Sequence, residues 1–136
     1  MANDPNLIFP FNHTGVFTIG TGQPGAVTLN AILTVPNNSS IVSGHGTLSQ
    51  AIDPPLQGNT SFNGVVYSLG FGAAKQIYAL VGTPTLLGQT TYVTSLFIVL
   101  DGDWGTKGTA TYTYLKNGVP HVIADVPVKV QWLLQG

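Results

Sequence analysis

Apolar and polar residues alternate with a period of two along much of this chain. In the segment 26–35 one face carries only aliphatic residues, namely Val27, Leu29, Ala31, Leu33 and Val35. The same alternation recurs over 108–115, where Ala110, Tyr112 and Tyr114 share a face, and over 126–132. This pattern is typical of β-strands with one buried face. No window shows a convincing helical period, so the sequence predicts an all-β protein.

Turn-forming residues divide the alternating runs. Asn117-Gly118 is the strongest hairpin signal, because both residues tolerate positive φ. The predicted strands lie near 15–20, 26–35, 41–50, 60–69, 76–83, 91–100, 108–116 and 121–133. About eight antiparallel strands with short connections favour a meander or Greek key that forms a sandwich or small barrel. We expect a single domain over residues 1–136, with 1–14 as an N-terminal extended segment.

Charge is scarce, which narrows the classes of function. Only 7% of the residues are charged, with no Arg, Glu or Cys, whereas about a quarter is usual. Four scattered Lys do not make a nucleic-acid surface. The absence of Cys excludes disulfides, zinc–thiolate sites and cysteine nucleophiles. The longest apolar stretch, near 96–100, is too short for a membrane-spanning helix.

The N-terminal residues give no sign of a targeting signal. A secretory signal begins with a basic region before its apolar core, and the first ten residues contain no Lys or Arg. We therefore expect no signal peptide and a cytoplasmic location by default. Non-classical export stays open.

The segment 92–100 departs from simple alternation because it is apolar on both faces. Tyr92, Leu96, Ile98 and Leu100 share one face, and Val93, Phe97 and Val99 share the other. Only one face of a strand in such a domain meets the core, so the other needs a cover. Ile8, Phe9 and Phe11 of the N-terminal segment are one candidate cover, and a second subunit is another. The second alternative predicts an oligomer interface at Val93, Phe97 and Val99.

One acidic loop, 101–105, combines features of a sugar-binding site. Carboxylate and amide acceptors beside an aromatic ring suit a neutral glycan, and the predicted set is Asp101, Asp103, Trp104, Tyr114 and Asn117. His45, with Asn63, forms a second candidate group on a polar strand face. Two plainer interpretations compete: the aspartates cap a polar turn, and Trp104 is a buried plug at the end of the core. A calcium loop would need a further acidic ligand that is missing here.

No motif in the sequence points to catalysis. The three histidines, His13, His45 and His121, lie on separate segments without the spacing of a metal site, and no Gly-x-Ser-x-Gly elbow is present. A tuned acid–base pair needs residues that this chain offers in very small number. We therefore expect no enzyme activity, no metal and no cofactor.

Three phrases of the sequence resemble those of a known family. They are 44–56 (GHGTLSQAIDPPL), 108–114 (GTATYTY) and 124–129 (ADVPVK). They are similar to parts of a family of small bacterial proteins known only as a domain of unknown function, and the likeness runs from about Gly15 onward. The resemblance implies bacterial origin and supplies no catalytic residues.

Two hypotheses about function follow from these observations. The first is a non-catalytic β-domain that acts through association as a self-assembling homo-oligomer. The alternative is a lectin-like module, free or as a component of a host-directed toxin, that binds neutral glycans. Solution mass tests the first hypothesis, and a glycan array tests the second.

Overall fold

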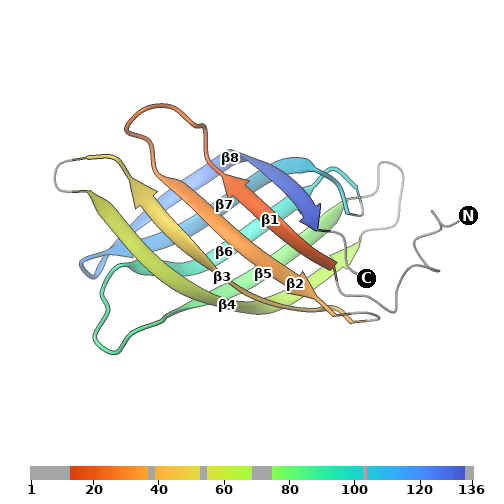
Figure 1. Ribbon diagram of the computed structural model, residues 1–136, viewed down its shortest axis with the longest axis horizontal. Coiled ribbons are helices and arrows are strands. Elements are labelled where there is room, and N and C mark those ends of the chain that lie inside the picture. Colours follow the sequence, from red (N-terminus) through yellow and green to blue (C-terminus); the bar gives the residue numbers. More distant parts are fainter. Residues whose placement is uncertain (1–12, 37–38, 53–54, 69–74, 103, 134–136) are drawn as a thin grey trace, which may run out of the picture.

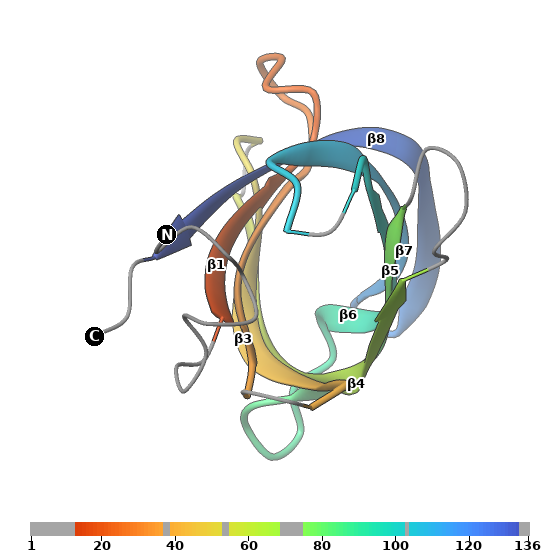
Figure 2. The ribbon, with the colours of Figure 1, turned by 90° about the vertical axis from the view of Figure 1, so that its right-hand side faces the viewer.

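The computed structural model describes residues 13–36, 39–52, 55–68, 75–102 and 104–133. These residues form eight strands: β1 (His13–Ile19), β2 (Thr28–Val35), β3 (Ile41–Gln50), β4 (Leu56–Ser68), β5 (Gln76–Pro84), β6 (Tyr92–Leu100), β7 (Lys107–Lys116) and β8 (Val119–Leu133). Each strand pairs antiparallel with the next, and β8 pairs with β1 to close the barrel (Figure 1). Figure 2 looks toward one end of the barrel and shows the strands arranged as a ring. The all-β prediction is confirmed, with the small barrel in place of the sandwich.

The alternating pattern of the sequence matches the two faces of the barrel wall. On β2 the aliphatic residues Leu29, Ala31, Leu33 and Val35 are buried inside, as predicted. The interior is filled by such side chains, and the largest are the aromatic residues Phe17, Phe62, Tyr78 and Tyr112. Burying each large apolar side chain contributes roughly 1.5–3 kcal/mol relative to leaving it in water. The filled interior is the main source of the barrel's stability.

A few polar groups lie inside this apolar core. The amide oxygen Oε1 of Gln76 accepts hydrogen bonds from the Tyr78 hydroxyl (2.9 Å) and from the Trp104 backbone N–H (3.1 Å). The Thr60 hydroxyl accepts a bond from the Val93 N–H (2.9 Å). In contrast, the buried hydroxyl of Tyr112 has no hydrogen-bond partner among the described residues. Burial, and secondarily the nearby Tyr114, raises the pKa of Tyr112 above its ordinary value.

A β-bulge in β6 changes which residues of this strand face the core. The β6–β7 register pairs Val93 with Tyr114 and then Ser95 with Thr113, so that Thr94 is an extra residue on β6. The bulge reverses the alternation before it and turns Val93 into the core, where it is fully buried. The prediction that Val93 lies on the outer face is therefore wrong. Phe97 is exposed and Val99 is half-buried on that face, as expected.

The loops gather at the two ends of the barrel (Figure 1). The β6–β7 turn lies at the same end as the start of β1 and the end of β8. The β1–β2 loop, the β5–β6 loop and the β7–β8 turn lie at the opposite end. We call these the β6–β7 end and the β7–β8 end. No helix in the described residues is long and apolar enough to cross a membrane.

Candidate functional site

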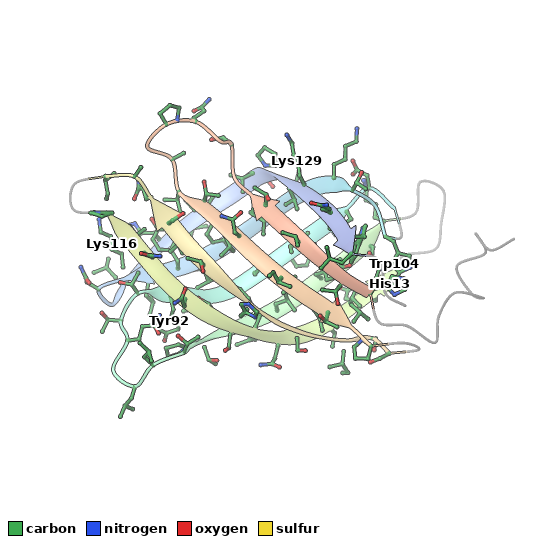
Figure 3. All side chains as sticks on the ribbon, viewed as in Figure 1. His13, Tyr92, Trp104, Lys116 and Lys129 are labelled. Carbon is green, nitrogen blue, oxygen red and sulfur yellow. The ribbon has the colours of Figure 1, made fainter. Side chains whose placement is uncertain are left out.

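Aromatic rings close the β6–β7 end of the barrel. The imidazole of His13, on β1, stacks on the indole of Trp104 with ring centroids 3.4 Å apart and planes at 1°. Trp132, on β8, meets Trp104 edge-on with centroids 5.3 Å apart. Its indole Nε1–H donates to the Gly105 carbonyl (2.9 Å), which ties β8 to the β6–β7 turn. Figure 3 shows His13 beside Trp104 at this end.

The position of Trp104 fits the plug interpretation and not an open sugar platform. Its backbone has a φ of 55° and its N–H bonds the buried Gln76, so the turn directs it back onto the core. His13 covers one face of the indole, which reduces the aromatic surface on which a sugar ring could stack. Burial lowers the pKa of His13 below its ordinary value, which favours the neutral ring in the stack.

The acidic loop lies beside this aromatic cap. Asp101 is exposed, and its Oδ1 accepts a contact of 3.4 Å from the Nζ of Lys75, which is also half in solvent. An exposed pair of this kind contributes little to stability. Asp103, the other predicted acid, lies outside the described residues. The described part of the predicted site is therefore a surface ion pair beside a covered indole.

The remaining members of the predicted glycan site lie elsewhere. Asn117 is in the β7–β8 turn, at the opposite end from Asp101 and Trp104, with a φ of 51° as the hairpin signal required. Tyr114 points into the barrel and is buried, and burial raises the pKa of its hydroxyl. The His121 ring stacks near Tyr114, with centroids 5.1 Å apart. These residues do not converge with the acidic loop.

His45 and Asn63 lie on the outer face of β3 and β4. Both are exposed, because Val42 and Leu48 of β3 face the core and alternation sends His45 outward. The strand register pairs His45 with Ser61, diagonal to Asn63. The predicted polar strip is present, but it is an open strand surface. Among the described residues, no three histidine or acidic side chains gather as metal ligands.

A groove that the sequence did not indicate lies at the β7–β8 end. It has a volume of about 430 Å³ between the β5–β6 loop and the start of β4, and it is lined by neutral groups, including Gln57, Asn59, Thr85 and Thr90. The side chain of Gln89 lines the groove and fixes the β5–β6 loop through hydrogen bonds. Its Oε1 accepts bonds from the Thr85 and Leu86 N–H groups, and its Nε2 donates to the Asn59 and Thr91 carbonyls (2.7 and 2.8 Å). The loop carries no periodic pattern or motif, which is why no sign of the groove appears in the sequence.

The outer surface of β3–β6 is the other distinctive feature. Its apolar residues are Ile41, Val65, Tyr67, Ile77, Ala79, Val81, Phe97 and Val99, and together they are called the β3–β6 face below. The ladder sets Ile41 opposite Val65, Val65 opposite Ala79, and Ala79 opposite Phe97. These four strands contain no Asp, Glu, Lys or Arg. Side chains that point outward here are apolar or neutral.

Fold and surface define this protein as a closed, eight-stranded antiparallel barrel with a filled apolar interior and few charges. The family model described as Domain of unknown function (DUF1842) matches residues 13–119. The chain belongs to this family. The match begins with β1 and ends at the first residue of β8, so the phrase at 124–129 lies outside the matched residues. A comparison with curated proteins found no match.

Proposed function

We propose that this protein is a non-catalytic domain that works by self-association through the β3–β6 face. The observation that carries the proposal is the continuity of exposed apolar surface over four strands without a charge. Val81 is 62% exposed and Phe97 is 44% exposed, and on β4 the exposed Val65 and Tyr67 pair with Ala79 and Ile77 of β5. Contiguous apolar patches of this kind mark association surfaces, and charges are depleted at the centres of interfaces.

Closure of the barrel determines how association through this face works. Strands β3 to β6 each have a neighbour on both sides, so their peptide groups are used within the sheet. The contact is therefore made by side chains, through burial of the rows that contain Val65 and Phe97. Each Å² of apolar surface removed from water contributes about 25 cal/mol.

The test compares two lysine substitutions on opposite sides of the barrel. Phe97→Lys places a charge in the β3–β6 face. Ile32→Lys places the same charge at an exposed aliphatic position on β2, across the ring of strands. We expect light scattering at micromolar concentration to show an assembly for the parent chain and for Ile32→Lys. Phe97→Lys should lower the mass while circular dichroism stays that of the parent.

Two outcomes contradict the proposal. One is a monomeric parent chain across this concentration range. The other is a Phe97→Lys variant with the same mass as Ile32→Lys. Val99 is half-buried on the same face, so Val99→Lys serves as a second variant if Phe97→Lys does not fold.

The groove at the β7–β8 end favours a second candidate function, the binding of a neutral glycan. Its lining offers amides and hydroxyls without charge, which suits polyhydroxylated ligands. The predicted residues Asp101 and Trp104 are not part of it. We expect a glycan-array hit that Asn59→Ala removes and Trp104→Ala retains. A blank array with a folded protein counts against this function, as does a hit that depends on Trp104.

A further inference from the structure

Within the part of the chain that the structure describes, the first half of β8 has a neighbouring strand on one side only. Its ladder with β7 runs from Val119 onward, whereas its ladder with β1 begins at Val128. Six of the seven residues from Val119 to Asp125 are exposed, although they belong to a strand. Val119 and Val122 are 57% and 66% exposed. The barrel is closed, but this segment extends beyond the closure as a free strand edge.

The β1–β2 loop leaves this edge open. After Gly20 donates its N–H to the Pro127 carbonyl (2.9 Å), the chain turns away from β8. The Gln50 side chain, at the end of β3, then donates to the Gly25 carbonyl (2.9 Å) and holds the loop on the far side of β1. A methyl group placed on Gly22 would touch nothing within 4 Å. Figure 2 shows the loop projecting outward from the barrel wall.

Two backbone hydrogen bonds show which peptide groups face the open side. Val130 donates its N–H to Thr106, toward β7, whereas the Pro127 carbonyl points to Gly20. The β7–β8 ladder then gains one residue on β8, because Ala110 pairs with Val126 and Tyr112 pairs with Ile123. This irregularity reverses the alternation.

The peptide groups of Ile123 therefore face β7, and those of Val122 and Ala124 face the open side. The two-residue turn at 117–118 predicts the same alternation, because Lys116 pairs directly with Val119. The N–H and C=O groups of Val122 and Ala124 therefore point to the open side, and these two residues lie symmetrically about Ile123.

We propose that this edge pairs with the same edge of a second copy of the chain, antiparallel and centred on Ile123. In that register Val122 of each copy lies opposite Ala124 of the other. The two resulting pairs form roughly four N–H···O=C bonds across the axis. His121 lies opposite Asp125 of the other copy, so a basic and an acidic residue meet and no like charges do. The segment is complementary to itself, which identifies the partner as a second copy.

The residues that flank the segment restrict it to this register. Pro120 has no N–H to offer the open edge, and Pro127 already bonds Gly20 through its carbonyl. Asp125 has a φ of 53° and its N–H bonds the Thr111 hydroxyl (3.1 Å), so regular pairing stops there. Such features protect an edge against indiscriminate pairing. Here they leave a short central segment open, and a shift by one residue would place peptide groups that face β7 against the partner.

Cysteine cross-linking tests the register directly, because the chain contains no Cys. In the proposed register, Ile123 of one copy lies opposite Ile123 of the other copy. The two residues form a non-hydrogen-bonded pair, in which the Cα atoms approach to about 4.5 Å. That distance lies within the range of a disulfide. Gln131→Cys is the matched control, because Gln131 lies on the same strand and is exposed, but its side toward β1 is already paired with Val16. Under mild oxidation we expect Ile123→Cys to form a covalent dimer at least tenfold faster than Gln131→Cys.

A second pair of variants separates edge pairing from chance collision. Val122→Pro removes the N–H that faces the open side and leaves the ladder with β7 intact, whereas Val122→Thr retains the N–H. In the Ile123→Cys background, Val122→Pro should abolish the rapid cross-link and Val122→Thr should keep it. Equal rates for Ile123→Cys and Gln131→Cys, or a cross-link that survives Val122→Pro, overturn the proposal. If Val122→Pro does not fold, the comparison of the two cysteine variants still decides.

This contact deepens the proposed self-association but lies on a different part of the barrel. The experiments can contradict the edge contact without contradicting association through the β3–β6 face, and the reverse. A rapid Ile123→Cys cross-link that persists in the Phe97→Lys background supports the edge without the β3–β6 face. A mass that falls with Phe97→Lys while Ile123→Cys stays unlinked supports the face and overturns the edge.

Discussion

The imidazole of His13 lies parallel to the indole of Trp104, with centroids 3.4 Å apart, and links the first strand of the barrel to the β6–β7 turn. Burial lowers the pKa of His13 below 6.5, so the unfolded chain binds a proton more readily than the folded one. The contribution of His13 to the free energy of unfolding is therefore fully present above about pH 6.5 and is lost progressively as the pH falls below this value.

His13→Phe keeps a ring on the indole and removes the titration. We expect the difference in unfolding free energy between about pH 7.5 and about pH 5.5 to be smaller in this variant than in the parent. Denaturant titration followed by tryptophan fluorescence measures both. An unchanged pH dependence would contradict the assignment to His13.

Two buried tyrosines should respond in opposite ways to loss of the hydroxyl. The Tyr78 hydroxyl donates to Gln76, so Tyr78→Phe should lower the free energy of unfolding by about 1 kcal/mol. The buried Tyr112 hydroxyl has no hydrogen-bond partner in the described part of the chain, so Tyr112→Phe should leave stability unchanged or raise it by up to about 1 kcal/mol. Thermal and denaturant unfolding compare the two. Equal losses would mean that the Tyr112 hydroxyl is satisfied in solution, for instance by a buried water.

Gly82 tests how closely the strands approach one another. A methyl group at this position would overlap the backbone oxygen of Val93 on β6. Because backbone atoms on both sides are held by ladders, we expect Gly82→Ala to cost at least about 3 kcal/mol or to prevent folding. Gly118→Ala is the contrast, since nothing lies within 4 Å and only its φ of 81° opposes a side chain. It should cost about 1–2 kcal/mol, and similar losses for both variants would refute the steric argument.

Gln89 is expected to control the order of the β5–β6 loop without affecting the barrel. Gln89→Glu replaces the amide donor by a carboxylate oxygen facing the Asn59 and Thr91 carbonyls, which repels them. Hydrogen exchange at the Thr85 and Leu86 amides should become faster by tenfold or more. Amides of β1 and β2 serve as the internal reference. Protection that persists at Thr85 would show that the loop is held by other contacts.

Alternation and turn residues were sufficient to predict the strands. The predicted and observed bounds of β3 agree at both ends, and the Asn117-Gly118 hairpin has the positive φ angles expected for it. These features depend on local chemistry, namely the side-chain period and the tolerance of Asn and Gly for left-handed backbone.

Features that depend on the whole barrel were not predicted. Whether β1 meets β8 is decided by twist and stagger summed over all the strands, so the sequence left sandwich and barrel open. The bulge at Thr94 reversed the orientation of Val93, and apolar residues on both faces concealed the reversal. The glycan residues were grouped by chemistry, whereas topology separates Asp101 from Asn117. Pro120 did carry a usable signal, because proline inside a strand indicates an edge.

The β1–β8 ladder makes the barrel a ring in which no strand is structurally first. Thr14 of β1 lies directly opposite Leu133 of β8, so the start of the first strand and the end of the last strand are already side by side. All other ladders join strands adjacent in the chain, and β1–β8 pairing alone must wait for distant segments to meet, which is slow. A circular permutant opened at Asn117-Gly118 and joined across Thr14 and Leu133 would make that ladder local and leave β7–β8 as the long-range step. The same native barrel would then be reached with a different rate-limiting closure.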